Sequence, residues 1–158
     1  MDKDLKTLVA TLTNKNQTIS TMESCTGGAL ANAITNTPGS SQIFKFGAVT
    51  YSNEFKIKMG VPEETIKKYS VYSKETAIEM SKAISKFTNS DFSIGITGKI
   101  NTPDPNNKFG NDNEIFISIY KKHKNIAKSL TIKVQEKPRN EVKTEIITKT
   151  IKTLLEII

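Results

Sequence analysis

The sequence predicts an α/β fold, a three-layer α/β/α sandwich built on a mixed β-sheet. Two observations predict it. Segments with the apolar spacing of helices alternate with short β-branched or apolar runs along most of the chain. Near the C-terminus two such runs follow one another as a hairpin before a last helical segment, so we expect both parallel and antiparallel pairing in the sheet.

The first elements are a helix, a strand and a second helix. Residues 4–14 place apolar side chains at helical spacing, and residues 18–22 form a β-branched run that predicts a strand. Small residues from Thr26 onward favour a helix, which the Thr-Pro-Gly-Ser cluster at 37–40 ends. A strand should therefore deliver the chain to a helix N-terminus through residues 23–25.

The middle of the chain continues this alternation. Residues 44–51 predict a strand that ends at Tyr51, followed by a short helix over 54–59 and another that begins at Pro62. A longer helix over 74–87 precedes a strand over 92–97. The apolar residues that this longer helix places on one face are Ala77, Ile78, Met80, Ala83, Ile84 and Phe87.

The last part of the chain begins with a long loop. Residues 98–113 are rich in Asn, Asp, Pro and Gly, and this stretch is too long to be a simple connection in a compact domain. Residues 114–120 and 126–135 then predict a hairpin, and Pro138 begins a helix that ends near Ile158. With no repeat and no linker, residues 1–158 predict a single domain.

Composition limits the class of protein. Hydrophobic residues make up 36% and charged residues 25% of the chain, which is typical of a folded domain rather than a disordered one. No stretch approaches the roughly 20 apolar residues of a membrane span, and the N-terminus carries two aspartates where a signal peptide carries positive charge. We expect a cytoplasmic protein without a membrane partner.

Few side chains are available for a metal centre. Cys25 is the only cysteine and His123 the only histidine, which excludes an internal disulfide and a centre built from histidines. A carboxylate Mg²⁺ site stays open. We expect neither a metal nor a cofactor.

The net charge of +7 indicates either an anionic partner or a genome-level composition bias, which explains it equally well. The lysines are spread along the chain without interleaved aromatic residues, so we expect no nucleic-acid binding, although a binder driven by charge alone stays an alternative. Arg139, the only arginine, is the exception, because a guanidinium group binds phosphate or carboxylate with two parallel hydrogen bonds.

Ser24 lies in the predicted bend between a strand and a helix, where unpaired backbone N–H groups could stabilise an oxyanion. The simpler alternative is that Ser24 or Thr26 caps the helix. A serine nucleophile needs a base, and His123 falls in the predicted hairpin tip, which leaves lysine. Such a lysine must be buried or lie near other cations to lose its proton, and chemistry alone does not choose among the lysines.

Five motifs occur in one order at family-like spacing. They are Glu-Ser-Cys-Thr-Gly-Gly (23–28), Pro-Gly-Ser-Ser (38–41), Val-Thr-Tyr-Ser-Asn-Glu-Phe-Lys (49–56), Gly-Val-Pro-Glu-Glu-Thr (60–65) and Gly-Ile-Thr-Gly (95–98). Together they resemble the CinA C-terminal domain family, known for amidohydrolases that convert nicotinamide mononucleotide to nicotinate mononucleotide and ammonia. Longer CinA proteins also carry an N-terminal pyrophosphatase-like domain, which we do not expect here.

The resemblance implies catalytic roles for three residues. Ser24 would be the nucleophile, Lys56 the base, and Tyr51 a hydrogen-bonding partner that orients them. The alternatives are that Tyr51 is an ordinary strand aromatic and Lys56 a solvated helix lysine. Cys25 beside Ser24 is either a thiol nucleophile or, as we expect, a small buried residue.

The resemblance also implies a nucleotide-binding pocket. Backbone N–H groups from Cys25 to Gly27 would hold the oxyanion. The phosphate would bind either at the helix N-terminus or at Arg139, which is otherwise a surface residue. The residues implied to bind substrate are Cys25, Thr26, Gly27, Gly28, Thr97, Gly98 and Arg139. We also expect a homodimer.

The chain departs from the family after Gly98. Relatives continue Ile-Ala-Gly-Pro and further glycines, whereas this chain reads Lys-Ile-Asn-Thr-Pro-Asp-Pro over 99–105. Losing glycines removes backbone freedom and changes the pocket wall. The sequence therefore predicts either an amidohydrolase with altered selectivity or a nucleotide-binding module without turnover.

Overall fold

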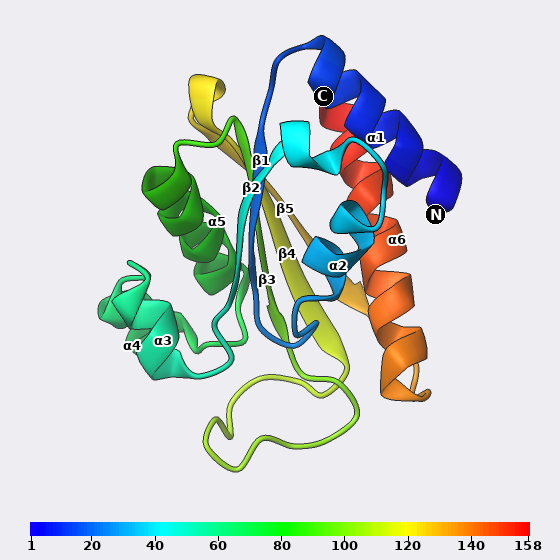
Figure 1. Cartoon of the computed structure of the whole chain (residues 1–158). Helices are drawn as coiled ribbons and strands as arrows, with labels where there is room; N and C mark the ends of the chain where they lie inside the picture. The colour runs from blue at the N-terminus through cyan, green and yellow to red at the C-terminus, as the bar shows by residue number, and fades with distance from the viewer.

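The computed structural model describes residues 1–158 and has a five-stranded sheet at its centre, with helices on both faces (Figure 1). In chain order the elements are α1 (Asp2–Asn14), β1 (Ile19–Glu23), α2 (Ala29–Thr35), η1 (Ser40–Gln42), β2 (Phe44–Val49), α3 (Asn53–Lys58), α4 (Glu63–Tyr69), α5 (Lys74–Thr88), β3 (Phe92–Gly98), β4 (Glu114–Lys121), η2 (Lys122–Lys124), β5 (Ile126–Lys133) and α6 (Arg139–Ile157). The predicted three-layer α/β/α sandwich is confirmed.

The sheet is mixed, as predicted. Its strand order is β2-β1-β3-β4-β5. Strands β2, β1 and β3 run parallel, whereas β4 pairs antiparallel with β3 and β5 antiparallel with β4. All residues of β1 and β3 are buried, as expected of parallel strands covered on both faces.

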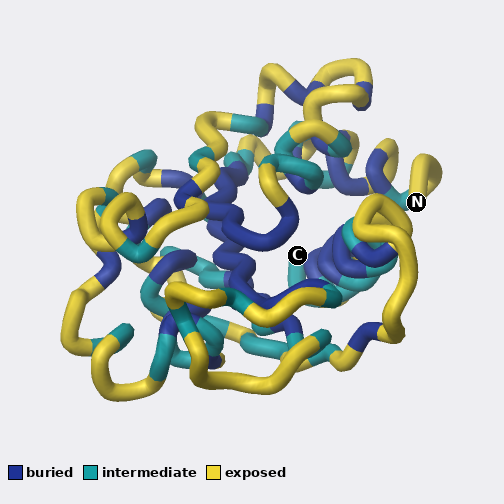
Figure 2. Tube along the Cα trace, turned by 90° about the horizontal axis from the view of Figure 1, so that it is seen from below, coloured by how far each residue is buried: buried dark blue, intermediate teal, exposed yellow.

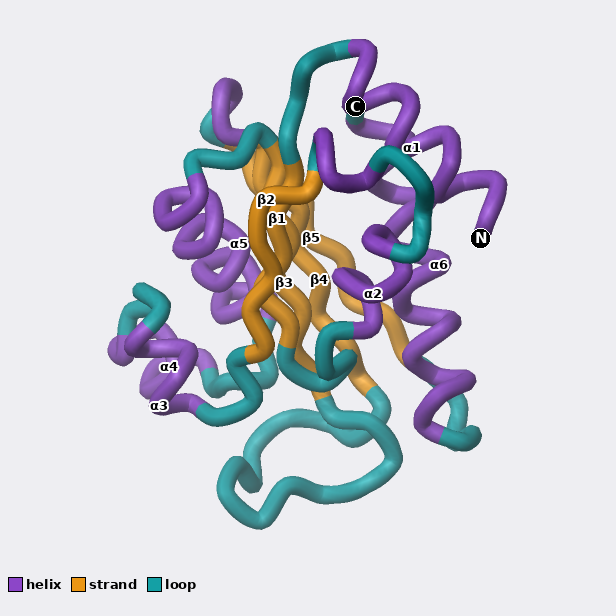
Figure 3. The backbone as a smooth tube through the Cα atoms, in the orientation of Figure 1, coloured by secondary structure: helices purple, strands orange, loops and turns teal.

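The two faces of the sheet are packed differently. Helices α1, α2 and α6 cover one face, and α5 covers the other with α3 and α4 nearby (Figure 3). The α1, α2 and α6 side contains most of a cluster of 22 buried hydrophobic side chains. On the α5 side the apolar cluster has only four members, Met22, Val61, Met80 and Ile84.

Helix α5 lies close to the sheet through small and polar residues. Ser81 and Ser118 share a buried hydrogen bond of 2.8 Å, and a Cβ atom at Gly95 would lie 2.3 Å from the Ala77 carbonyl oxygen. The expected apolar face of this helix was wrong at Phe87, whose side chain is 64% exposed and lies beside Phe46, with 5.4 Å between ring centroids. The hydropathy spacing predicted that Phe87 lies on the buried face of α5, but serine side chains occupy part of that face.

Several element boundaries differ slightly from expectation. Helix α2 begins at Ala29 rather than Thr26, because residues 25–28 form turns in which Gly27 and Gly28 have φ values of 61° and 91°. Strand β2 ends at Val49, so Tyr51 lies beyond it. None of the helices combines the length and the apolar character needed to cross a membrane.

The topology creates a crevice at the carboxyl ends of β1 and β3. The chain leaves β1 toward α2 on one face and leaves β2 toward α3, α4 and α5 on the other, and ligands bind in open α/β sheets where the connections diverge in this way. The loop 98–113 crosses the same end. Figure 2 views the molecule from this end, and most residues of the loop are exposed.

Candidate active site

Ser24 and Lys56 meet at the carboxyl end of β1. Ser24 directly follows the strand, and its N–H donates to the Ile96 carbonyl oxygen of β3 at 3.0 Å, which fixes its backbone. The Lys56 Nζ atom lies 3.0 Å from Ser24 Oγ and donates to the Thr50 carbonyl oxygen at 2.8 Å. Lys56 is 1% exposed and Ser24 7%. The interpretation of Lys56 as a solvated helix lysine is therefore wrong.

The surroundings of Lys56 favour its neutral form. Burial lowers its pKa to about 8, and the negative charge of Asp104 opposes that shift. The ammonium group forms no ion pair with a carboxylate, so nothing nearby compensates fully for its lost hydration. A neutral Lys56 amine is therefore accessible near neutral pH and can accept the proton of the Ser24 hydroxyl.

Helix α3 reverses the usual burial pattern. Its charged Lys56 is buried, while its apolar neighbours Phe55 and Ile57 are 54% and 36% exposed. Ser52 caps the helix by accepting a hydrogen bond from the Phe55 N–H at 3.2 Å. Lysine is almost never fully buried without an ionic partner, so this exception makes Lys56 a candidate functional side chain.

Glu23 is a structural residue of the site that the sequence interpretation missed. Its carboxylate is fully buried and accepts hydrogen bonds from Thr26 Oγ1 at 2.7 Å, from the Leu30 N–H at 3.0 Å and from the Ala31 N–H at 2.9 Å. It therefore caps α2 in the role expected of Ser24 or Thr26. An acidic residue at the end of a buried strand, shortly before a predicted helix, was the available signal.

The cap by Glu23 occupies the helix N-terminus at which the sequence predicted a phosphate site. The N–H groups of the first turn of α2 are occupied, since Ala29 donates to the Thr26 carbonyl oxygen and the next two donate to Glu23. Thr26 is fully buried and Gly27 lies near Lys143 rather than in the cavity beside Ser24. Between the two phosphate sites expected from the sequence, the geometry favours Arg139.

Fewer backbone N–H groups are available to hold an oxyanion than the sequence predicted. The Gly27 N–H donates to the Ser24 carbonyl oxygen at 2.9 Å, so it is not free for a ligand. The N–H groups of Cys25 and Thr26 donate to no other residue of the chain, but only Cys25 lines the cavity, since Thr26 is fully buried. A free backbone donor next to a nucleophile can stabilise a tetrahedral oxyanion, which makes the Cys25 N–H the candidate donor.

A cavity of about 520 Å³ opens in front of Ser24. Its lining residues are Ser24, Cys25, Tyr51, Ser52, Asn53, Tyr72, Gly98, Lys99, Ile100, Thr102, Pro103, Asp104, Pro105, Asn106, Asn107 and Arg139. Of the predicted substrate-binding residues, the cavity brings together Cys25, Gly98 and Arg139. Thr26, Gly27, Gly28 and Thr97 lie outside its lining.

Three lining residues differ from their expected surroundings. Tyr51 is 67% exposed and its hydroxyl makes no hydrogen bond to Ser24 or Lys56, so an orienting role would depend on bound substrate. Arg139 begins α6 and donates through Nη1 to the Ile100 carbonyl oxygen. Burial raises the pKa of the Cys25 thiol to about 12, which keeps it protonated and disfavours the thiol-nucleophile alternative.

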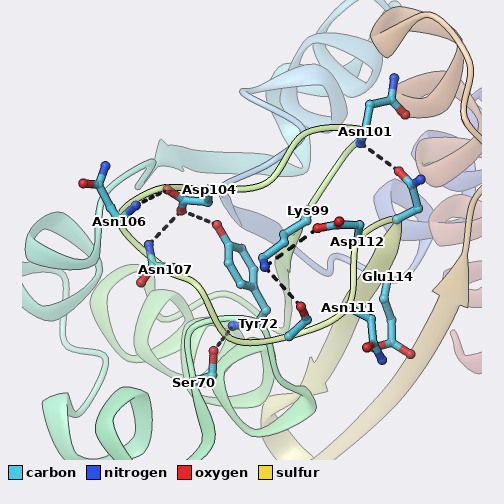
Figure 4. Close-up of polar contacts among 12 residues, drawn as sticks. Ser70, Tyr72, Lys99, Asn101, Asp104, Asn106, Asn107, Asn111, Asp112 and Glu114 are labelled. Atoms are coloured by element: carbon cyan, nitrogen blue, oxygen red, sulfur yellow. Dashed lines mark hydrogen bonds and ion pairs between the residues drawn. The ribbon is translucent and has the colours of Figure 1, made fainter.

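The loop 98–113 forms the outer wall of the cavity and is held by side-chain contacts (Figure 4). The Tyr72 hydroxyl donates to the Asp104 carboxylate, and Asn53 Nδ2 donates to Asn107 Oδ1 at 2.8 Å. Lys99, which is 5% exposed, donates from Nζ to the Gly110 carbonyl oxygen at 3.1 Å. The loop in which the family's glycines were expected is therefore held in place by side-chain hydrogen bonds.

Comparison with known proteins identifies the family. The profile of the CinA C-terminal domain matches residues 2–158 of the chain. The chain belongs to the CinA C-terminal domain family. The CinA family resemblance seen in the ordered motifs is thereby confirmed, and the match extends through the altered loop to the last helix.

Individual CinA relatives match a smaller part of the chain. A Clostridium botulinum protein whose name describes it as competence-damage inducible is 47% identical over 92 residues, which is 58% of this chain and 22% of that protein. A CinA-like protein of Endomicrobium trichonymphae is 51% identical over 88 residues, 55% of this chain and 20% of that protein. The matched segment thus spans about a fifth of the length of these curated relatives.

Solved CinA structures share the fold over nearly the whole chain. The competence/damage inducible protein CihA from Agrobacterium tumefaciens has a TM-score of 0.88 at 24% identity, covering 98% of this chain and 93% of that one. A CinA superfamily protein from Escherichia coli has a TM-score of 0.91 at 22% identity, covering 99% and 90%. At these identities the likeness concerns the fold.

Proposed function

We propose that the protein is an amidohydrolase that converts the carboxamide of nicotinamide mononucleotide to a carboxylate and releases ammonia. The observation that carries the proposal is the 3.0 Å contact between Lys56 Nζ and Ser24 Oγ in a buried pair, of which Ser24 lines a cavity of about 520 Å³. Family membership and the ordered motifs support the choice of substrate.

The first half of the reaction forms an ester. The neutral Lys56 amine takes the proton of the Ser24 hydroxyl while Oγ attacks the amide carbon, and the N–H group of Cys25 donates to the oxyanion. The tetrahedral intermediate collapses, the carbon–nitrogen bond breaks, and the Lys56 ammonium returns its proton to the leaving nitrogen. Ammonia leaves and an acyl-serine remains.

The second half releases the acid. Water enters the cavity and gives a proton to Lys56 as its oxygen attacks the ester carbon. The bond from carbon to Ser24 Oγ then breaks, and Oγ recovers a proton from Lys56. Arg139, a cation on the cavity lining that still has unused N–H donors, would hold the phosphate.

Ammonia release by purified protein tests the proposal. We expect release from nicotinamide mononucleotide by the wild type and its loss in Lys56→Ala. Retention of full activity by that variant would contradict the mechanism. Intact folding of the variant, checked by circular dichroism, is the necessary control.

The altered loop favours one alternative, a nucleotide-binding module without turnover. Glycines in relatives are replaced here by Lys99, Asn101 and residues up to Pro105, and the wall they form is anchored by side chains. This alternative predicts measurable nucleotide binding with no ammonia released at high protein concentration.

We also propose the homodimer expected from the sequence. Strand β2 pairs with β1 on one side only, and Phe46 and Val49 on it are exposed. An unpaired apolar edge strand is a surface that proteins usually cover. Light scattering should give twice the chain mass of 17.5 kDa, and a monomer at micromolar concentration would contradict the proposal.

A further inference from the structure

An ionised carboxylate without a cationic partner lines the cavity that contains Ser24. Asp104 accepts hydrogen bonds from the Tyr72 hydroxyl, from Asn107 Nδ2 at 2.8 Å and from the Asn106 N–H at 2.9 Å. All three donors are neutral, and no lysine or arginine forms an ion pair with Asp104. Its negative charge therefore remains uncompensated by the protein.

The hydrogen bonds also keep this carboxylate charged. Burial alone would raise the pKa of Asp104, but the hydrogen bonds from Tyr72, Asn107 and Asn106 outweigh burial, so that its pKa lies below the ordinary value. The charge reaches the catalytic pair, since it acts to raise the pKa of Lys56. Asp104 is thus electrostatically coupled to the place where the substrate amide must lie.

The two cationic side chains that line the same cavity, Lys99 and Arg139, bind other groups and not Asp104. Lys99 Nζ lies 5.1 Å from the centroid of the Tyr72 ring, 3.8 Å from the Asp112 carboxylate and 3.1 Å from the Gly110 carbonyl oxygen. Figure 4 shows Tyr72 with its hydroxyl toward Asp104 while Lys99 lies beside the ring and faces the other arm of the loop. Arg139 donates to the backbone at Ile100.

We propose that Asp104 is a specificity-determining residue that selects amides whose ring carries a positive charge. The proposal rests on the proposed function and deepens it, because the pyridinium ring of nicotinamide mononucleotide has a fixed positive charge next to its carboxamide. The cavity then offers complementary charges to both ends of a zwitterionic substrate: Asp104 to the cationic ring and Arg139 to the anionic phosphate.

A matched pair of substrates isolates the ring charge. Nicotinamide mononucleotide and its reduced dihydropyridine form share the carboxamide, ribose and phosphate, but only the first has a cationic ring. Ammonia release from each is measured with wild type and Asp104→Asn, a change that keeps size and removes charge. Taking the variant-to-wild-type ratio for each substrate cancels the difference in their intrinsic reactivity.

Asp104→Asn should lower kcat/KM for the cationic substrate about tenfold, because a half-exposed carboxylate is partly screened, and leave the neutral substrate within twofold. Glu136→Gln, which removes the same charge from an exposed residue outside the cavity, should change neither substrate. Equal loss for both substrates in Asp104→Asn would show that Asp104 merely supports the loop, and no loss for either would also overturn the proposal.

Binding separates this inference from the proposed function. If wild type releases no ammonia from either substrate, the proposed function fails while the selectivity remains measurable as the ratio of the two dissociation constants by calorimetry. Asp104→Asn should then reduce the preference for the cationic nucleotide about tenfold. An unchanged ratio would contradict the role of Asp104 independently of catalysis.

Discussion

The two walls of the cavity are built in different ways. The inner wall carries Ser24, with the buried Lys56 in contact with it, and is fixed by backbone hydrogen bonds at the ends of β1 and β3. The outer wall, the loop 98–113, is mostly exposed and is held by side chains such as Tyr72 and Lys99. We therefore propose that the chemistry lies in the wall that the family motifs specify, and selectivity in the wall where this chain departs from them.

The largest effect is expected from Lys56→Met, which removes the proposed base and keeps much of the side-chain volume. Turnover should fall about 10³-fold or more, as for loss of a member of other catalytic dyads and triads. Stability should stay equal or rise, because the buried amine has no charged partner. Ammonia release and urea unfolding measure the two quantities, and activity within tenfold of wild type would refute the assignment.

The lowered pKa of Lys56 makes stability depend on pH. Between about pH 8 and pH 10.5 the unfolded chain holds a proton on Lys56 that the folded chain has lost, so the free energy of unfolding should rise with pH. The stabilisation is complete above pH 10.5, is lost as pH falls through about 8, and amounts to at most about 3 kcal/mol. Cys25 and Asp104 are the other titratable groups that act on Lys56.

Urea unfolding of the wild type across this pH range, with Lys56→Met as the control, measures the contribution of Lys56 to the free energy of unfolding. The variant should lack the rise that is specific to Lys56, while the other lysines contribute equally to both proteins. Turnover of the wild type should increase through about pH 8 as the amine becomes neutral. Identical stability profiles in the two proteins would show that the pKa of Lys56 is not lowered.

A smaller effect is expected from Glu23→Gln in the support of the inner wall. The amide group cannot accept from the Thr26 hydroxyl and the Leu30 and Ala31 N–H groups as a carboxylate does, so unfolding should cost about 1–2 kcal/mol less. Glu64→Gln, on an exposed residue, should stay within about 0.5 kcal/mol of wild type. Equal values for the two variants would contradict the capping role.

The smallest effect is expected in the outer wall. Tyr72→Phe removes one hydrogen bond to Asp104 while Asn106 and Asn107 still donate to it. KM should rise roughly threefold with kcat within twofold, because a single hydrogen bond contributes about 1 kcal/mol or less. Steady-state kinetics measures both, and a loss of kcat like that of Lys56→Met would mean that the two walls do not divide chemistry from selectivity.

The sequence predicted the fold well because hydrophobic spacing reports which side chains are buried in regular elements. The prediction failed at Phe87, which is exposed. Helix α5 instead contacts the sheet through Ser81, and its backbone lies close to Gly95 of β3. A close approach of backbone to backbone leaves no hydropathy pattern, so only the assembled structure reveals it.

The candidate site was predicted in part for a similar reason. The motifs identified Ser24 and Lys56, yet no property of the sequence alone separates a buried lysine from the other lysines of the chain. The capping role of Glu23 depends on contacts that form only on folding. The position of Asp104 does so too, because its hydrogen-bond donor Tyr72 lies 32 positions earlier in the chain. The catalytic and binding roles of the predicted residues remain predictions.

Ammonia release from nicotinamide mononucleotide by wild type and by Ser24→Ala tests the central claim most directly. We expect steady release by the wild type and a loss of about 10³-fold or more in the variant, which lacks the hydroxyl proton that Lys56 would accept. Undiminished release by Ser24→Ala would contradict the account, because the buried pair of Ser24 and Lys56 would then not carry the reaction.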